Sequence, residues 1–324
     1  MSKIDIISGF LGAGKTTLIK KLIAEAYQNE KIVLIENEFG EIGIDGTFLK
    51  DSGVTINEMN SGCICCSLVG DFETSLKEVL DTYHPDRVII EPSGVGKLSD
   101  VIKAVSTINS DEMELDNFIT VVDAKKCRMY TKNFGEFYNN QVEHASLIVL
   151  SRSQDLTEFQ LKECLDILKG LNDHSPIITT AWDKLNGLDI INACEVNIQE
   201  ELLHEHDHEC CGHDHHHHDH DHECGCGHHH HHADEVFTSW GQETVKTFTK
   251  EQIEGILKKL SEDTAYGMVL RAKGMVAGAD GQWIYFDMVP EEYEVRDGAP
   301  EFTGRICVIG SKLAEDKLAE LFGL

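Results

Sequence analysis

Residues 9–16 read Gly9-Phe10-Leu11-Gly12-Ala13-Gly14-Lys15-Thr16, and this stretch decides the class of fold that the chain adopts. The pattern G-x-x-x-x-G-K-[S/T] is the signature of a loop whose backbone N–H groups surround the phosphates of a nucleotide. An apolar run, Ile4–Ser8, precedes the loop, and apolar residues at helical spacing follow it from Leu18 to Ala26. A strand, a glycine-rich loop and a helix in this order are the context that the motif requires.

The motif assigns a contact to each of its special positions. The glycines Gly9, Gly12 and Gly14 let the backbone curl closely around the β-phosphate. Lys15 is expected to place its charge against the β- and γ-phosphates, and Thr16 to offer its hydroxyl to Mg²⁺. The partial positive charge of the helix N-terminus strengthens the attraction for the anion. The motif therefore predicts a nucleotide site.

A second element of that site is expected at residues 88–94, Val88-Ile89-Ile90-Glu91-Pro92-Ser93-Gly94. An apolar strand here delivers Glu91 at its carboxyl end, which is the edge where open α/β sheets bind ligands. Glu91 is expected to hold the shell of Mg²⁺ or to orient water, and Gly94 to bring a backbone N–H near the γ-phosphate. Glu91 joins Lys15 and Thr16 as the predicted catalytic residues.

Short β-branched runs alternate with helical patterns over roughly the first 190 residues. Almost continuously apolar strands that alternate with helices indicate a parallel sheet covered on both faces. The predicted fold class is α/β, a P-loop NTPase domain with a mostly parallel sheet, in residues 1–195. The predicted strands are Ile4–Ser8, Ile32–Glu36, Val88–Glu91, Phe118–Asp123, Leu147–Ser151 and Ile177–Thr180.

The composition changes abruptly after this region. From His204 to His232 the chain is almost entirely His, Asp, Glu, Cys and Gly, and it holds fifteen of the 18 histidines. With few apolar residues to bury, residues 196–235 are predicted to be a metal-binding linker that is disordered without metal. Apolar periodicity returns in residues 236–324, which are predicted to form a small C-terminal α+β domain. Its predicted elements are a helix around Ile253–Leu260, strands at Met268–Ala272, Trp283–Val289 and Ile306–Ile309, and a final helix at Ala314–Phe322.

Charge and apolar patterning exclude several classes of partner. The chain has 57 acidic and 28 basic residues, and its net charge of −29 opposes binding to nucleic acid or to anionic membranes. The N-terminus runs into a strand without an apolar signal stretch, and no apolar run approaches the ~20 residues that span a bilayer. We therefore expect a cytoplasmic protein, in which clustered cysteines are more often metal or redox ligands than disulfides.

Three thiols lie within four residues in the segment Cys63-Ile64-Cys65-Cys66, between the two phosphate motifs. Adjacent cysteines point in different directions along a helix or a strand, so they seldom serve one apolar face. Three thiolates suit Zn²⁺ and leave a tetrahedral site one ligand short, which favours exchange of the metal. The alternative is a redox-sensitive loop or buried small residues. The isolated cysteines, expected to lie in the core, are Cys127, Cys164, Cys194 and Cys307.

These motifs together resemble the CobW-like family of P-loop GTPases, which is related to the GTPases that deliver nickel to urease and hydrogenase. The matching segments are GFLGAGKTT at 9–17, ENEFGEIGID at 36–45, GCICC at 62–66, EPSG at 91–94 and VVDA at 121–124. RAKG at 271–274 and RICVIG at 305–310 are similar to the family's second domain. The resemblance covers nearly the whole chain, and it implies GTP hydrolysis coupled to the binding and transfer of a transition metal.

The resemblance also implies roles for single residues. Gly12 to Thr17, including Ala13, would bind phosphate, Glu91 would be the Walker B acid, and the three clustered cysteines would be metal ligands. Residues 36–45 would form a switch near the γ-phosphate. Its candidates for contact with Mg²⁺, water or the transported metal are Glu38, Glu41 and Asp45.

One departure from the family concerns the nucleotide base. The family places Asn-Lys-x-Asp after the strand at 147–150, and its Asp reads the guanine N1 and N2 donors. This chain has Ser151-Arg152-Ser153-Gln154 there, followed by Asp155. Gln154 offers one neutral carbonyl acceptor where a carboxylate offers two charged ones, so a one-residue shift could bring Asp155 into use. Arg152 could stack on the base. The predicted base contacts are therefore Ser151, Arg152, Gln154 and Asp155.

The histidine-rich tract is expected to capture or buffer metal, and the alternative is a solvated linker with incidental affinity. Imidazole suits Zn, Ni, Cu and Co, so the tract does not select among these metals. The predicted ligands are His204, His206, His208, Cys210, Cys211, His213, His215, Cys224, Cys226 and His228.

The leading hypothesis is a GTP-dependent metallochaperone or insertase with GTP and Mg²⁺ as cofactors and Zn²⁺ as its metal, while Co²⁺ and Ni²⁺ stay open. Its partner would be a client metalloprotein. The alternatives are a metal buffer or sensor with a regulatory nucleotide site, and an ATP-using P-loop enzyme. The sequence contains no recognisable arginine finger, so slow hydrolysis is expected until a client or a homodimer completes the site.

Overall fold

A seven-stranded parallel sheet organises the N-terminal part of the chain. The computed structural model describes residues 1–37, 55–59, 69–108, 112–194 and 233–324. Within these residues the strand order is β3-β2-β4-β1-β5-β6-β7. Because every pairing is parallel, all the carboxyl ends meet at one edge of the sheet. The strands are β1 (Ser2–Gly9), β2 (Ile32–Asn37), β3 (Thr55–Met59), β4 (Arg87–Glu91), β5 (Met113–Asp123), β6 (Leu147–Ser151) and β7 (Ile177–Ile178).

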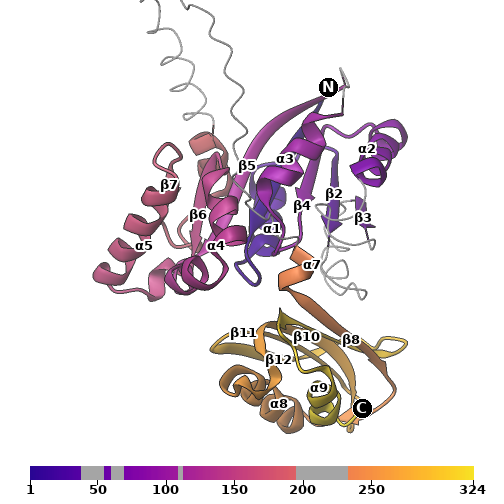
Figure 1. Ribbon diagram of the computed structural model, residues 1–324. Coiled ribbons are helices and arrows are strands. Elements are labelled where there is room, and N and C mark those ends of the chain that lie inside the picture. Colours follow the sequence, from indigo (N-terminus) through magenta and orange to yellow (C-terminus); the bar gives the residue numbers. More distant parts are fainter. Residues whose placement is uncertain (38–54, 60–68, 109–111, 195–232) are drawn as a thin grey trace, which may run out of the picture.

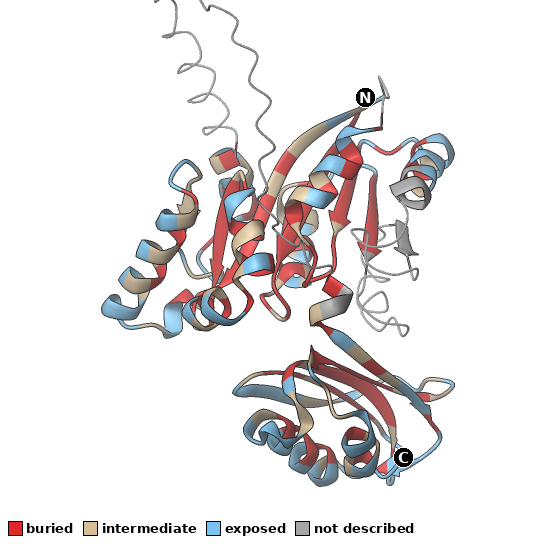
Figure 2. Ribbon diagram, in the orientation of Figure 1, coloured by how far each residue is buried: buried red, intermediate tan, exposed pale blue. Residues whose placement is uncertain are grey.

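Helices cover both faces of this sheet (Figure 1). On one face, α1 (Lys15–Glu25) and the helical residues 187–194 pack against the strands. The other face carries α2 (Val69–Tyr83), α3 (Leu98–Ser106), α4 (Cys127–Glu143) and α5 (Glu158–Leu171). The strands between the two layers are buried along most of their length, as Figure 2 shows in red. None of the described helices combines the length and apolar character needed to cross a lipid bilayer.

The second sheet is antiparallel apart from one short pairing. Its order is β12-β11-β10-β13-β8, and β9 pairs in parallel with β10. The helices α8 (Lys250–Glu262) and α9 (Glu315–Phe322) cover one face of this sheet, and α7 (Ala233–Val236) precedes it. The strands are β8 (Thr238–Thr244), β9 (Thr247–Phe248), β10 (Met268–Gly278), β11 (Trp283–Val289), β12 (Glu292–Gly298) and β13 (Gly304–Ser311).

The predicted fold class is confirmed, together with most of its elements. The predicted strands lie within the observed ones, except that β7 ends at Ile178 and does not reach Thr180. Patterning missed β9, which has only two residues, and β3, β8 and β12, which carry few apolar residues: β12 reads EYEVRDG. Two helix starts have a local cause, since Thr157 and Thr249 each form a capping box with a glutamine three residues later.

The uncovered face of the second sheet packs on the N-terminal part of the chain. Phe237 lies between α4 and the phosphate loop, with its ring centroid 5.4 Å from that of Phe134 and 6.1 Å from that of Phe10. Met275 and Tyr285 of the second sheet are buried in the same apolar cluster. The two sheets therefore share a core, and that core includes a residue of the loop itself.

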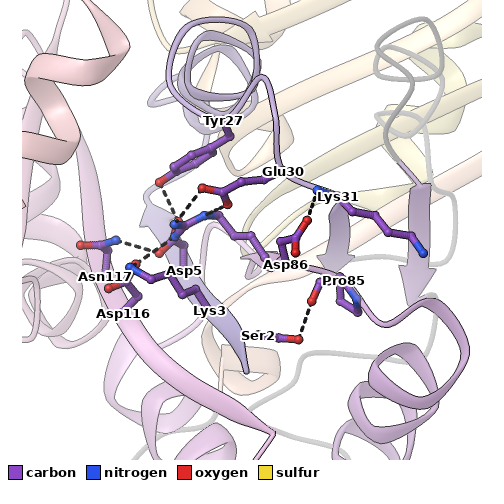
Figure 3. A network of polar contacts seen from close by, with 11 residues as sticks. Ser2, Lys3, Asp5, Tyr27, Glu30, Lys31, Pro85, Asp86, Asp116 and Asn117 are labelled. Atoms are coloured by element: carbon purple, nitrogen blue, oxygen red, sulfur yellow. Dashed lines mark hydrogen bonds and ion pairs between the residues drawn. The ribbon is translucent and has the colours of Figure 1, made fainter.

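A buried polar network closes the amino edge of the first sheet, opposite the phosphate loop (Figure 3). The Arg87 guanidinium donates to Asp5 at 2.8 Å, to Asp116 at 3.0 Å and to Glu30 at 2.6 Å. Asp5 is fully buried and also accepts from Tyr27 and from Asn117, each at 2.8 Å. Burial raises the pKa of Asp5, and Arg87 opposes that rise. The network stabilises a charge that the core would otherwise exclude.

Arg87→Ala is expected to lower the free energy of unfolding by about 3–5 kcal/mol at neutral pH, because it leaves a buried carboxylate without its cation. Without Arg87 the pKa of Asp5 rises further, so the folded variant takes up a proton more readily than the unfolded chain does. Stability from that proton is present at low pH and lost as the pH rises through the folded-state pKa, so the defect shrinks on acidification. Urea unfolding at several pH values measures both effects.

Lys3→Ala is the matched control. Lys3 also pairs with Asp116, at 3.2 Å, but its side chain is 49% exposed. Its loss is expected to cost less than about 1 kcal/mol at any pH. Equal costs for the two substitutions would contradict the role assigned to the buried network.

Candidate functional site

The phosphate loop joins β1 to α1 at the carboxyl edge of the first sheet. Gly14 precedes the first residue of α1 and has a left-handed φ of +107°. The first turn of α1 carries no acidic residue, so nothing there opposes an anion at the helix N-terminus. Phe10 and Leu11 are buried and hold the loop to the core, while the glycine-rich half turns toward a cavity.

Lys15, Thr16 and Glu91 lie together on this cavity, whose volume is about 370 Å³. The Thr16 hydroxyl lies 3.3 Å from each carboxylate oxygen of Glu91. The Lys15 ammonium lies 3.9 Å from Glu91 and donates to the Gly9 carbonyl at 3.1 Å. The three residues predicted to be catalytic therefore come from two adjacent strand ends, and Gly12, Gly14 and Thr17 line the same cavity.

Gly94 packs closely against Leu11 of the phosphate loop. A methyl group in place of its hydrogen would lie 3.0 Å from the Leu11 backbone nitrogen and 2.9 Å from the Leu11 side chain. The Gly94 carbonyl accepts from the buried Gln141 side chain at 3.2 Å. The EPSG turn and the phosphate loop are thus in close contact, although Gly94 does not line the cavity described above.

A second cavity of about 480 Å³ lies beside the loop, toward β6 and β7. Ser151 and Gln154, two of the predicted base contacts, line it together with Ala13 of the phosphate loop. Asp155 does not line it: this side chain is 47% exposed and lies 3.9 Å from Lys125. The reason is local, since Ser153–Asp155 forms one turn of 3-10 helix that turns Asp155 away.

Sequence reasoning missed four consecutive residues that line this second cavity, Ala181, Trp182, Asp183 and Lys184. The Trp182 indole N–H donates to the Leu150 carbonyl at 2.8 Å, which places the segment after β7 against the end of β6. The signal in the sequence was the position of these residues directly after the last predicted strand, at the ligand-binding edge.

Arg152 borders the second cavity and also contacts the phosphate loop and the second sheet. Its guanidinium donates to the Gly12 carbonyl at 3.1 Å and to Asp123 at 3.0 Å, and it pairs with Glu292 of the second sheet at 3.0 Å. Burial raises the pKa of Asp123, and the charge of Arg152 lowers it. Arg152 therefore holds the phosphate loop, Asp123 and the second sheet together, although it also borders the second cavity.

The second sheet forms one wall of the first cavity. Val289 lies directly against Gly12, and Arg271, Asp287 and Arg296 line the cavity with it. Lys126 donates to Glu291, in the turn between β11 and β12, at 2.7 Å, and this hydrogen bond lowers the pKa of Glu291. None of these C-terminal residues belongs to a recognisable nucleotide-binding motif, so their position at the cavity follows only from the tertiary structure.

The predicted ligands of the transported metal lie outside the described residues. Among the residues that the structure places, no three His, Cys, Asp or Glu side chains gather into a metal site. The four isolated cysteines are buried, as expected. The ligands and switch carboxylates outside the described ranges are Cys63, Cys65, Cys66, Glu38, Glu41, Asp45, His204, His206, His208, Cys210, Cys211, His213, His215, Cys224, Cys226 and His228.

Comparison with known proteins identifies the family. Residues 3–179 match the family described as CobW/HypB/UreG, nucleotide-binding domain, and residues 237–323 match the CobW C-terminal domain. The chain belongs to the CobW/HypB/UreG family. The resemblance seen in its motifs is thereby confirmed for both parts of the chain.

Individual relatives of this CobW-family chain carry names that refer to zinc. The zinc chaperone YeiR of Escherichia coli is 34% identical over 158 residues, 48% of each chain. The zinc chaperone CobW of Sinorhizobium sp is 30% identical over 63% of this chain and 67% of its own. The zinc-regulated GTPase metalloprotein activator 1 of Schizosaccharomyces pombe is 24% identical over 90% of this chain and 76% of its own. The matched segment thus spans about half of the first of these relatives.

Gly12→Ala is expected to disturb the contact between the loop and the second sheet. Gly12 has a left-handed φ of +68°, and an added methyl would overlap with Val289. Backbone strain costs roughly 1–2 kcal/mol, and the overlap adds to it. Adding Val289→Ala removes the overlap, so a double-mutant cycle of unfolding free energies is expected to show a favourable coupling of roughly 0.5–3 kcal/mol.

Gly281→Ala is the matched control, because Gly281 has a φ of +86° with nothing within 4 Å of the added methyl. Gly281→Ala introduces backbone strain but no overlap with another residue. Its cost in unfolding free energy and that of Val289→Ala are therefore expected to be additive. A Gly12–Val289 pair that behaves additively would contradict the described contact.

Proposed function

We propose that this protein is a GTP-dependent metallochaperone, which hydrolyses GTP and couples that reaction to the delivery of a transition metal, foremost Zn²⁺, to a client metalloprotein. One observation carries the proposal: Lys15, Thr16 and Glu91 converge on a single cavity, with the Thr16 hydroxyl 3.3 Å from both Glu91 oxygens. The names of the relatives, which refer to zinc chaperones and to a GTPase, support the choice of metal and nucleotide.

The residues on this cavity suit Mg²⁺. A hydroxyl and a carboxylate are the oxygen ligands that Mg²⁺ prefers in proteins, and here they lie within hydrogen-bonding distance of each other. Bound Mg²⁺ supplies positive charge that neutralises the β- and γ-phosphates. Thr16 and Glu91 would hold it, while Lys15 would bind the phosphates and the N-terminus of α1 would orient them. Gly94 would support the loop through its contact with Leu11.

The clustered cysteines Cys63, Cys65 and Cys66 are proposed to hold the transported metal near this cavity. They lie between the two phosphate motifs in sequence, so a change at the γ-phosphate can act on their loop. Three thiolates leave one tetrahedral position for a client's ligand. The histidine-rich tract is proposed to collect metal in a larger number of weaker sites. A homodimer or a client would stimulate the reaction.

For the base we propose a reading that differs from the sequence-based one. Guanine presents two adjacent N–H donors, which a carboxylate accepts best. Asp183 is the carboxylate that lines the second cavity, whereas Asp155 lies outside it. Asp183 and Gln154 are therefore proposed to bind guanine, with Trp182 at the wall of the cavity.

Asp183→Ala is expected to weaken GDP binding by roughly tenfold or more, because a hydrogen bond to a charged group contributes about 1.5–3 kcal/mol. Affinity for ADP is expected to stay as it was, so the preference for guanine falls. Titration with fluorescent GDP and ADP measures both. Asp155→Ala is the control and should change neither. A loss of guanine preference in Gln154→Ala alone would move the role to Gln154, and tighter binding of ADP by the unaltered chain would favour an ATP-using enzyme.

Zn²⁺ affinity is expected to depend on the nucleotide. Competition titrations on the full chain with a GTP analogue, with GDP and without nucleotide should give different affinities for the tightest site. The Cys63/Cys65/Cys66→Ser variant should lose this difference. Deletion of residues 204–232 should remove metal equivalents but keep the difference. Equivalents bound by the tract should fall as the pH drops below about 6.5, because protonated imidazole does not ligate.

Each outcome of this titration has a clear reading. Equal affinity in all nucleotide states contradicts coupling and favours a metal buffer with a separate nucleotide site. Unchanged stoichiometry after deletion of the tract contradicts metal capture by the tract. Coupling that persists in the triple serine variant places the coupled metal elsewhere.

A further inference from the structure

One face of the second sheet is directed at the phosphate loop, and its residues follow from strand register. On β11, Tyr285, Asp287 and Val289 are successive residues of one face, because side chains alternate along a strand. Their cross-strand partners on β12 are Arg296, Glu294 and Glu292. The members of this set that line the phosphate cavity are Asp287, Val289, Glu292, Glu294 and Arg296, together with Arg271 of β10.

Arginine is concentrated around this cavity. The chain has only six arginines against 57 acidic residues, and Arg152, Arg271 and Arg296 line the cavity together. Two of them come from the second sheet, where nothing in the sequence indicates a phosphate site. Guanidinium groups bind phosphate oxygens with two parallel hydrogen bonds, which suits them to a triphosphate.

Each of the two C-terminal arginines is paired with a carboxylate on the same sheet. Arg271 lies 3.0 Å from Asp287, and Arg296 lies 3.5 Å from Glu294. These pairs are partly exposed and therefore weak, so a phosphate group with two charges can compete for the guanidinium. In the described arrangement, the carboxylates hold the arginines at the cavity wall.

This side of the second sheet contacts the N-terminal part of the chain at three points. Val289 packs on Gly12, Glu291 accepts from Lys126 at 2.7 Å, and Glu292 pairs with Arg152 at 3.0 Å. Lys126 is buried whereas Glu291 is 85% exposed, so the acidic turn between β11 and β12 reaches onto the N-terminal part of the chain. The second sheet thereby borders the phosphate cavity and is not a separate module.

We propose that Arg271 and Arg296 contact the terminal phosphate of a bound nucleoside triphosphate, so that the C-terminal sheet supplies in cis the cations that other nucleotide hydrolases take from a partner. The inference rests on the proposed nucleotide hydrolysis and adds residues to it. Triphosphate binding would exchange the Asp287 and Glu294 carboxylates for phosphate oxygens, and release of the phosphate would restore the carboxylate pairs.

In the hydrolysis reaction these arginines would act only through their positive charge. The oxygen of water bonds to the γ-phosphorus, and the bond from that phosphorus to the β–γ bridging oxygen breaks. The products are the diphosphate and inorganic phosphate, and the proton of water passes to phosphate or to solvent. The guanidinium groups stabilise the charge on the equatorial oxygens and neither gain nor lose a proton. They also couple the position of the second sheet to the presence of the γ-phosphate.

A purely structural role gives a different expectation. If the arginines only balance Asp287 and Glu294, their loss would change stability and leave nucleotide affinity and turnover as they were. The test therefore compares the affinity for triphosphate with the affinity for diphosphate, because a purely structural role leaves the ratio of the two affinities unchanged.

The experiment uses the full chain with Arg271→Ala, Arg296→Ala and the double variant. Turnover is followed by phosphate release, and affinities are measured for GDP and for a non-hydrolysable GTP analogue. The double variant is expected to lose at least about 100-fold in kcat, because an arginine at the γ-phosphate contributes 10³–10⁵-fold in related chemistry. Its affinity for the GTP analogue should fall by at least about tenfold while GDP affinity is unchanged. Lysine in place of either arginine should restore part of the affinity, since it keeps a point charge.

Arg305→Ala is the matched control. Arg305 is on β13 of the same sheet, has the same 34% exposure as Arg296 and pairs with Glu243 at 3.7 Å, but it does not line the cavity. It should keep wild-type turnover and affinities. Wild-type turnover and an unchanged ratio of triphosphate to diphosphate affinity in the double variant would overturn this inference and leave the proposed function intact. Absence of turnover in the unaltered chain would contradict the proposed hydrolysis, while the affinity ratio still decides the contact.

Discussion

The burial of Phe10 is the interaction on which the rest of the site depends. Phe10 is the second residue of the phosphate loop, and its ring packs 4.5 Å from Tyr130 and 5.5 Å from Phe134, both on α4. Phe237, which leads into the second sheet, packs at 6.1 Å against the same ring. Aromatic contacts of this kind are stabilising and have a defined geometry. One apolar residue thus holds the loop to its own helical layer and connects it to the C-terminal sheet.

Charged residues have different roles at the two edges of the first sheet. At the amino edge, Arg87 and Asp5 form a buried network with Glu30 and Asp116 that stabilises the core. None of these four residues lines either of the two cavities described above. At the carboxyl edge, Lys15 and Glu91 lie on a cavity, where their charges remain within reach of a ligand. A parallel sheet makes this separation possible because all strands end at the same edge.

The residues of the proposed nucleotide site differ in how well the sequence predicts their positions. Some belong to a contiguous motif, whereas others reach the site only through contacts between segments that are distant in the chain. Lys15 and Thr16 belong to a local motif whose backbone shape is set by its own glycines, so their positions follow from sequence. Asp155 does not line the base cavity, and the choice between Gln154 and Asp155 depends on a 3-10 turn. Asp183 and Trp182 reach that cavity only through the pairing of β7 with β6. Arg152 lines that cavity as well, but its contacts with Asp123 and with the Gly12 carbonyl depend on the tertiary structure.

The sequence by itself determined the α/β class, the phosphate loop, the acid at the end of β4 and the family, since each depends on local periodicity or a contiguous motif. Only the tertiary structure decided what faces the phosphates from the other side. Arg271, Val289 and Arg296 lie more than 250 residues from the loop in the chain, and no local pattern associates them with a phosphate site. They reach the cavity because the uncovered face of an antiparallel sheet must bury its apolar side chains, and the core around Phe10 and Phe237 is where it does so.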